Sequence, residues 1–207
     1  MNKIISFSLW GNNPKYTIGA IRNAELAKVI YPGWKVVIHI ANDVESDIAS
    51  ELNKLGAHLI HYQDGSWNSM FWRFTSADNN NIVISRDTDS RLSYREKYAV
   101  DDWLNGHKDF HIMRDHRCHA VPILGGMWGA RNGILKGITE MIEGYNKGAY
   151  DNKWQVDQNF LREIIYPMVY NKSCVHDEFF ENKPFPTKRV SDEFVGAAFN
   201  ADETPCM

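Results

Sequence analysis

The stretch Asn80-Asn81-Ile82-Val83-Ile84-Ser85-Arg86-Asp87-Thr88-Asp89-Ser90-Arg91 joins a short apolar run to two aspartates one residue apart. The apolar run predicts a buried strand over residues 82–85. Side chains two positions apart in an extended backbone point the same way, so Asp87 and Asp89 are expected to aim both carboxylates at one spot. Carboxylate oxygens favour hard cations, and Mg²⁺ leaves part of its coordination to water and phosphates. The stretch therefore predicts a metal site flanked by phosphate-holding arginines, or else an exposed turn whose charges pair in water.

Outward from this stretch, apolar runs alternate with helical patterns. Strands are expected at residues 4–9, 36–41 and 57–62, and helices at 16–30, 44–55 and 67–76. The order β-α-β-α-β-α-β is typical of an α/β protein with a mostly parallel, Rossmann-like sheet covered by helices on both faces. Ligands of such sheets bind beyond the carboxyl ends of the strands. Trp10-Gly11 and the acidic pair are therefore expected to border one crevice.

The second half of the chain is less regular. A glycine-rich strand is expected within residues 121–129, and helices at 131–145 and at 156–165, the latter ending before Tyr166-Pro167. The polar residues 200–207 are expected to fray. We interpret residues 1–207 as a single domain, with a nucleotide-binding part over about 1–92 and an acceptor and catalytic part over about 93–199.

Composition excludes several classes of protein. The 207 residues are 43% hydrophobic with a formal net charge of −3, which is enough for a sizeable core and argues against a nucleic-acid binder. The N-terminus lacks the pattern of a signal peptide, and no apolar run reaches membrane-spanning length. Three scattered cysteines favour a reducing compartment, so a cytoplasmic protein is expected.

Four motifs together resemble the GT-A class of nucleotide-sugar glycosyltransferases. They are Asp87-Thr88-Asp89, Met70-Phe71-Trp72-Arg73-Phe74, Pro122-Ile123-Leu124-Gly125-Gly126-Met127-Trp128-Gly129 and Asp157-Gln158. The chain looks most like the small hexosyltransferase domains of bacterial polysaccharide pathways and of chlorella viruses, which implies host cytoplasm if the source is viral. It also leaves open that the chain is one module of a larger polypeptide.

The resemblance implies a donor and a metal. Mn²⁺ or Mg²⁺ would sit on Asp87 and Asp89 against the diphosphate of a nucleotide sugar, usually a UDP-sugar, and a glycan would be the acceptor. His176 is the best candidate for a third metal ligand, in competition with His111, His116 and His119. The remaining donor-binding positions that the resemblance implies are Ser8, Leu9, Trp10, Gly11, Tyr16, Arg73, Arg86, Gly125 and Gly126.

Asp157 and Gln158 bear on the mechanism. In retaining relatives the matching acid and amide lie beside the donor sugar, so Asp157 would bind its hydroxyls while Gln158 faces the anomeric carbon. In an inverting enzyme Asp157 would instead be the general base. A third interpretation is an acid stabilised by a helix N-terminus. We favour retention.

Two other classes stand beside this interpretation. A haloacid-dehalogenase-like phosphatase would use Asp87 as its nucleophile, although that class carries its motif on the first strand. A non-catalytic domain would bind sugar or metal without turnover. The donor sugar, the acceptor and the linkage are left open by the sequence.

Overall fold

Among the residues that the computed structural model describes, 1–146, 153–190 and 192–206, seven strands form one sheet in the order β3-β2-β1-β4-β6-β5-β7. The strands are β1 (Lys3–Leu9), β2 (Lys35–Ala41), β3 (His58–Tyr62), β4 (Ile82–Ser85), β5 (Phe110–Arg114), β6 (Trp128–Ala130) and β7 (Ser173–Asp177). β3, β2, β1 and β4 are parallel, β5 and β7 are parallel, and β6 runs antiparallel between β4 and β5. The predicted mostly parallel sheet is confirmed, and both predicted parts of the chain supply strands to it.

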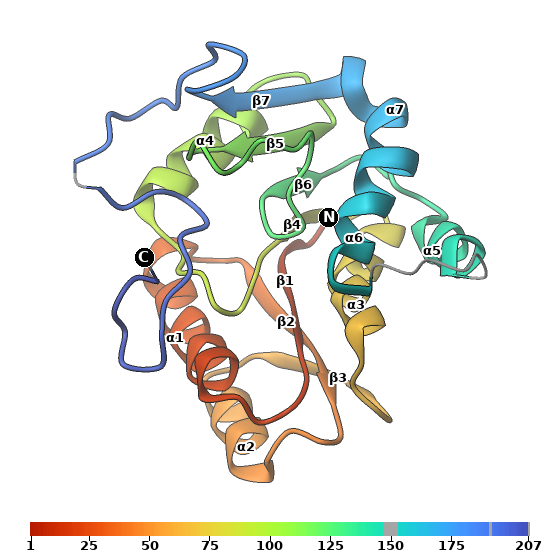
Figure 1. Cartoon of the computed structure of the whole chain (residues 1–207), viewed down its shortest axis with the longest axis vertical. Coiled ribbons are helices and arrows are strands. Elements are labelled where there is room, and N and C mark those ends of the chain that lie inside the picture. The colour runs from red at the N-terminus through yellow and green to blue at the C-terminus, as the bar shows by residue number, and fades with distance from the viewer. Residues whose placement is uncertain (147–152, 191, 207) are drawn as a thin grey trace.

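Helices cover both faces of this sheet (Figure 1). They are α1 (Pro14–Ile30), α2 (Ser46–Lys54), α3 (Trp72–Thr75), α4 (Tyr94–Asn105), α5 (Ile138–Asn146), α6 (Val156–Phe160) and α7 (Tyr166–Val169). One core joins α1, α2 and α4 to one face of the strands, and a second core joins α3, α5 and α6 to the other. The alternation of side chains along each strand creates these two cores, since Val83 enters one and Ile84 the other.

Several predicted elements differ in extent. The helix expected at 67–76 consists of the short α-helix α3 with a 3₁₀-helix on either side of it. The helix expected from residue 131 begins only at Ile138. The glycine-rich strand is reduced to three residues of β6, and α4, β5 and β7 were not predicted. The helix starting at Val156 continues past Pro167 by way of a π-helical turn, Leu161–Ile165.

The C-terminal segment is also different from its prediction. Residues 198–206 form a turn that bonds to the acidic loop, with the Phe199 amide donating to the Asp89 carbonyl at 2.8 Å. Glu203 pairs with Arg91 at 2.7 Å and with Arg22 at 3.4 Å. The prediction of a frayed tail is therefore wrong for the described residues, because backbone hydrogen bonds and ion pairs hold this polar segment against the rest of the protein.

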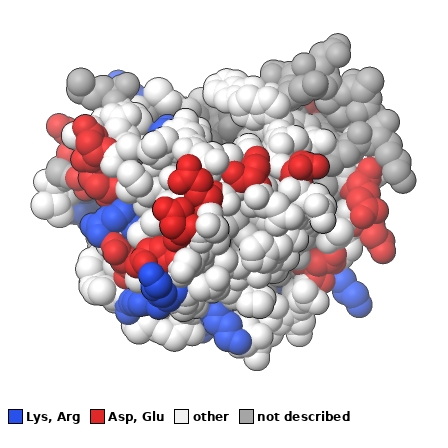
Figure 2. All heavy atoms as spheres, turned by 90° about the horizontal axis from the view of Figure 1, so that it is seen from below, with Lys and Arg blue, Asp and Glu red and all other residues white. Residues whose placement is uncertain are grey.

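The surface carries charges of both signs. On the face shown in Figure 2, acidic side chains are spread widely and basic ones lie among them, which matches the formal net charge of −3. Within the described ranges, none of the helices is long and apolar enough to cross a membrane.

Candidate active site

Arg73 is the centre of a charged cluster at the carboxyl ends of β1 and β4. Its Nη1 lies 2.7 Å from Asp87 Oδ1 and its Nη2 lies 3.0 Å from Asp157 Oδ2. The Arg73 backbone amide donates to Ser8 Oγ at 3.0 Å, which fixes α3 against the end of β1. The guanidinium is buried, so each charge is partnered where water is scarce. The cluster thus joins α6 to β1, α3 and the end of β4, all of which are distant from α6 in sequence.

Gly125 and Gly126 form one wall of this cluster. A Cβ at Gly125 would lie 2.5 Å from Arg73 Nη2 and 2.6 Å from Asp157 Oδ2, and a Cβ at Gly126 would overlap the Asp87 carboxylate. The Gly125 carbonyl also accepts from Ser85 Oγ at 2.8 Å. The absence of side chains lets the backbone approach the three charged groups closely.

Asp89 lies beyond the strand end, on the side of α1. Its Oδ2 is 2.8 Å from Lys15 Nζ, and Lys15 lies in the first turn of α1, where a cation is unfavourable unless an anion accompanies it. Tyr16 follows it and is partly exposed. The two aspartates of the acidic pair are therefore each matched by a different cation.

Burial and charge alter the acidity of the cluster. Loss of hydration raises the pKa of Asp87, and Asp89 and Asp157 raise it further while Arg73 opposes them. The pKa of Asp157 is raised as well, first by burial, with Arg73 again opposing. The pKa of Tyr16 is raised, mainly by burial and then by the charge of Asp89.

Three of the predicted donor-binding positions, Leu9, Trp10 and Gly11, lie at the end of β1 and in the loop that follows it. Trp10 packs against Gly65, where a Cβ would lie 2.5 Å from the Trp10 Cβ. The Gly11 amide donates to Asp43 Oδ1 at 2.9 Å, and Gly11 adopts a φ of +66°. The Leu9 side chain is buried in the core beside α1 and α2.

Arg86 lies on the opposite face from the cluster, which corrects its predicted role in holding phosphate. Its side chain is buried against α4, where Nε lies 2.8 Å from Glu96 Oε1 and Nη1 donates to the carbonyls of Ser85 and Trp128. The reason is the alternation of side chains at the end of β4, which sends Arg86 one way and Asp87 the other. Arg86 therefore fastens α4 to the sheet.

His176 is not brought to the acidic pair. It lies on β7, three strand positions from β4, which corresponds to about 14 Å of sheet width. Its Nδ1 is 2.8 Å from His111 Nε2. His116 stacks on Phe194 at 4.2 Å between ring centroids, and the His119 Nδ1 accepts from the Asp115 amide. A metal-ligand role for His176 beside Asp87 stays a prediction that this geometry does not support.

Gln158 follows Asp157 at the start of α6 and is half-buried. Its backbone N–H donates to Asp157 Oδ1 at 2.8 Å. Both oxygens of Asp157 are consequently occupied, one by Arg73 and one by this amide.

Two participants were missed by sequence reasoning. Lys15 could have been found, because a lysine in the first turn of a helix indicates a nearby anion. The C-terminal segment could not, because its bond to Asp89 is made by backbone atoms and has no residue-type signal.

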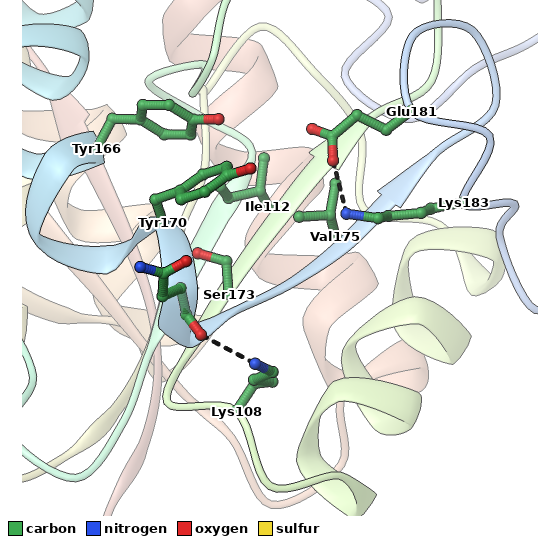
Figure 3. Close-up of a pocket in the computed structure, with 9 residues that line it drawn as sticks. Lys108, Ile112, Tyr166, Tyr170, Ser173, Val175, Glu181 and Lys183 are labelled. Carbon is green, nitrogen blue, oxygen red and sulfur yellow. Dashed lines mark hydrogen bonds and ion pairs between the residues drawn. The ribbon is translucent and has the colours of Figure 1, made fainter.

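A separate cavity of about 380 Å³ lies near β7, the edge strand of the sheet. Figure 3 shows the side chains that line it. Tyr166, Tyr170, Ile112 and Val175 line it, and Lys183 reaches Glu181 across its rim at 2.6 Å. Its lining comes from β5, β7 and the region of α7, whereas the charged cluster lies at the ends of β1 and β4.

Comparisons with known proteins give the fold. No protein-family model and no curated protein matches this sequence. Glucosyl-3-phosphoglycerate synthase of M. tuberculosis is similar over 92% of this chain and 73% of its own, with 14% identity and a TM-score of 0.50. Its complex with Mn²⁺, UDP-glucose and phosphoglyceric acid is similar over 84% and 69%, with 13% identity and a TM-score of 0.50. This chain has a GT-A fold.

A third solved structure is a glycosyltransferase involved in the glycosylation of the major capsid of PBCV-1, which is similar over 84% of this chain and 81% of its own, with 16% identity and a TM-score of 0.49. Within the GT-A fold of the present chain, the Arg73 cluster lies where parallel sheets bind their ligands, beyond the carboxyl ends of central strands.

Proposed function

We propose that this chain is a metal-dependent glycosyltransferase that moves a hexose from a nucleotide diphosphate sugar, a UDP-sugar, to a glycan acceptor with retention. The observation that carries the proposal is the buried guanidinium of Arg73 between Asp87 and Asp157, against Gly125 and Gly126. The similar M. tuberculosis synthase, which has been solved with Mn²⁺ and UDP-glucose, supports this class of donor.

The residues fit a hard divalent cation. Asp87 and Asp89 offer carboxylate oxygens, and 41% of the Asp87 side chain is exposed, so it is accessible to an ion. Gly126 keeps the space beside the Asp87 carboxylate free of a side chain. Asp87 and Asp89 would hold the ion, which would stabilise the negative charge that collects on the leaving diphosphate.

The chain's own residues have separate tasks in this proposal. Lys15 and Arg73 balance the negative charge of the acidic pair, and each would also attract the diphosphate of a bound donor. Arg73 also orients Asp157. These hydrogen bonds fix both oxygens of Asp157, and each oxygen keeps a further lone pair that can accept a donor hydroxyl. With Asp157 in that holding role and not acting as a general base, we propose retention.

Binding tests the metal and the nucleotide. Calorimetry of UDP should show an affinity at least tenfold higher with Mn²⁺ than without it, and Asp89→Asn should remove that difference. Asp47→Asn, which changes an exposed aspartate on α2, should leave it intact. Equal affinity with and without Mn²⁺ in the wild type would remove Asp87 and Asp89 from the ligand role.

Turnover tests the reaction. UDP-glucose and other UDP-hexoses should be hydrolysed slowly in the absence of an acceptor, and NMR taken before mutarotation should show the anomer of the donor. Asp157→Asn should slow the release of the hexose without changing its anomeric configuration. An inverted product would reassign Asp157 as a general base, and hydrolysis of p-nitrophenyl phosphate that depends on Asp87 would favour a phosphatase. Binding of UDP-hexoses without turnover of any of them would support the alternative of a non-catalytic binding domain.

A further inference from the structure

A second group of potential metal ligands lies between α4 and β7, away from the acidic pair. It comprises Asp102, Cys174 and His176, whose ligand atoms all lie within 4.8 Å of one another. Cys174 and His176 are two positions apart on β7, so their side chains leave the strand on the same face. Asp102 approaches from α4, and its Oδ2 is 3.3 Å from His176 Nε2.

A contact with His111 fixes the orientation of the His176 ring. Its Nδ1 is 2.8 Å from Nε2 of His111, which is fully buried and stacked on Trp103 at 5.3 Å between ring centroids. Metal-binding histidines usually donate the N–H of their second ring nitrogen to a neighbouring acceptor, which fixes the ring and leaves the first nitrogen for the ion. Here Nε2 of His111 would be that acceptor. His111 therefore supports an arrangement in which Nε2 of His176 faces the other two ligand atoms.

The chemistry of the group selects the ion. One thiolate, one imidazole and one carboxylate form a mixed sulfur, nitrogen and oxygen set, which suits Zn²⁺ and does not suit Mg²⁺ or Mn²⁺. Ligand atoms of a tetrahedral zinc site are about 3.5 Å apart, given bonds of about 2.0–2.3 Å. Asp102 is exposed, so its side chain has room to move into such a geometry.

We propose that Asp102, Cys174 and His176 bind one Zn²⁺ ion, with water in the fourth position. The ion ties β7, the edge strand of the sheet, to α4. The site is independent of the proposed transferase activity, because its ligands and its preferred metal both differ from those at Asp87.

Metal content is the first test. Protein dialysed against Zn²⁺ and then against metal-free buffer should retain one equivalent, measured by plasma emission. Co²⁺ should replace it and produce the intense near-ultraviolet band of a thiolate-bound ion. Cys174→Ser should lose the band and bind Zn²⁺ at least 100-fold more weakly.

Two further variants keep the test decisive. Asp102→Asn changes an exposed residue of α4 and keeps the size of the side chain, and it should weaken Zn²⁺ binding at least tenfold. Cys118→Ser removes an exposed cysteine elsewhere and should bind like the wild type. No retained zinc in the wild type, or equal zinc and an equal cobalt band in Cys174→Ser, would overturn the proposal.

Discussion

At the scale of single residues, Arg73 determines how the candidate site is assembled. One guanidinium meets two carboxylates through different nitrogens, a geometry that its planar fork permits and that the single ammonium of lysine does not. The sequence predicted Arg73 near the donor but did not pair it with Asp157, because the two residues are 84 positions apart and only the folded sheet brings them together.

The raised pKa of Asp87 leads to a pH prediction. Protons compete with a metal for the carboxylate, so the affinity for Mn²⁺ alone should fall as pH decreases through the folded-state pKa of Asp87, which lies above its ordinary value of 3.8. Arg73→Gln should move this loss to still higher pH, because Arg73 lowers the pKa of both Asp87 and Asp157. Calorimetry across a pH series measures both midpoints. Coincident midpoints in the two proteins would contradict the role given to Arg73.

The glycine wall leads to a prediction with an internal control. Gly126→Ala would force a methyl group into the Asp87 carboxylate, so Mn²⁺-dependent UDP binding should fall at least tenfold and the free energy of unfolding should fall by about 1–3 kcal/mol. Gly144→Ala places the same methyl group in open space within α5 and should raise that free energy by about 0.5–1 kcal/mol. Urea unfolding and calorimetry compare the pair. Equal UDP affinity in the two variants would show that Gly126 has no role in Mn²⁺-dependent UDP binding.

At the scale of secondary structure elements, the attachment of α4 to β4 depends on a buried ion pair. Arg86 and Glu96 are both almost fully enclosed, and Tyr31 also donates to Glu96 at 2.7 Å. Glu96→Gln leaves the charge of Arg86 buried and uncompensated, so the free energy of unfolding should fall by about 3–5 kcal/mol.

A neighbouring pair on the same helix is the control. Lys97 and Asp101 are more exposed, so Asp101→Asn should change the free energy of unfolding by less than about 1 kcal/mol. Urea unfolding of both variants tests the difference. If Glu96→Gln lowered the free energy of unfolding as little as Asp101→Asn does, the unpaired charge of Arg86 would be hydrated and its burial would carry no large cost.

The helix containing Pro167 shows a limit of local sequence signals. Proline removes one backbone donor and normally ends a helix, which predicted an end before Tyr166. The structure widens the preceding turn into a π-helical one, and this wider turn lets the chain continue through Pro167. Leu161 and Ile165, at the two ends of this turn, are both buried in the core, so the turn lies where long-range packing acts on the chain.

At the scale of the whole molecule, the two halves of the sheet differ in how far they could be predicted. β1 to β4 follow one another with helices between them, so periodicity located them. β6 has three residues and inserts between β4 and β5, so its position depends on long-range pairing that no local window contains. The same difference holds in the site, where Asp87 was visible as a motif and the surroundings of Arg86 and His176 were not.

The C-terminal segment provides the last prediction, because it connects the end of the chain to the acidic loop. The Phe199 amide bonds to the Asp89 carbonyl, and the Arg91 guanidinium lies 5.1 Å from the Phe199 ring centroid. Removing residues 198–207 should free this loop, and Mn²⁺-dependent UDP affinity should fall roughly tenfold, as expected from one or two lost hydrogen bonds of about 1 kcal/mol each.

Glu203→Gln keeps the backbone bond and weakens the ion pairs that the partly exposed Glu203 makes with Arg91 and Arg22, so it should change the affinity less than about threefold. Calorimetry of UDP with Mn²⁺ compares the two proteins, and circular dichroism verifies that the shortened chain is folded. If a folded, shortened chain binds UDP as tightly as the intact one, the segment does not order the loop. The ion pair with Lys15, which does not involve the C-terminal segment, would then account for the position of the Asp89 carboxylate.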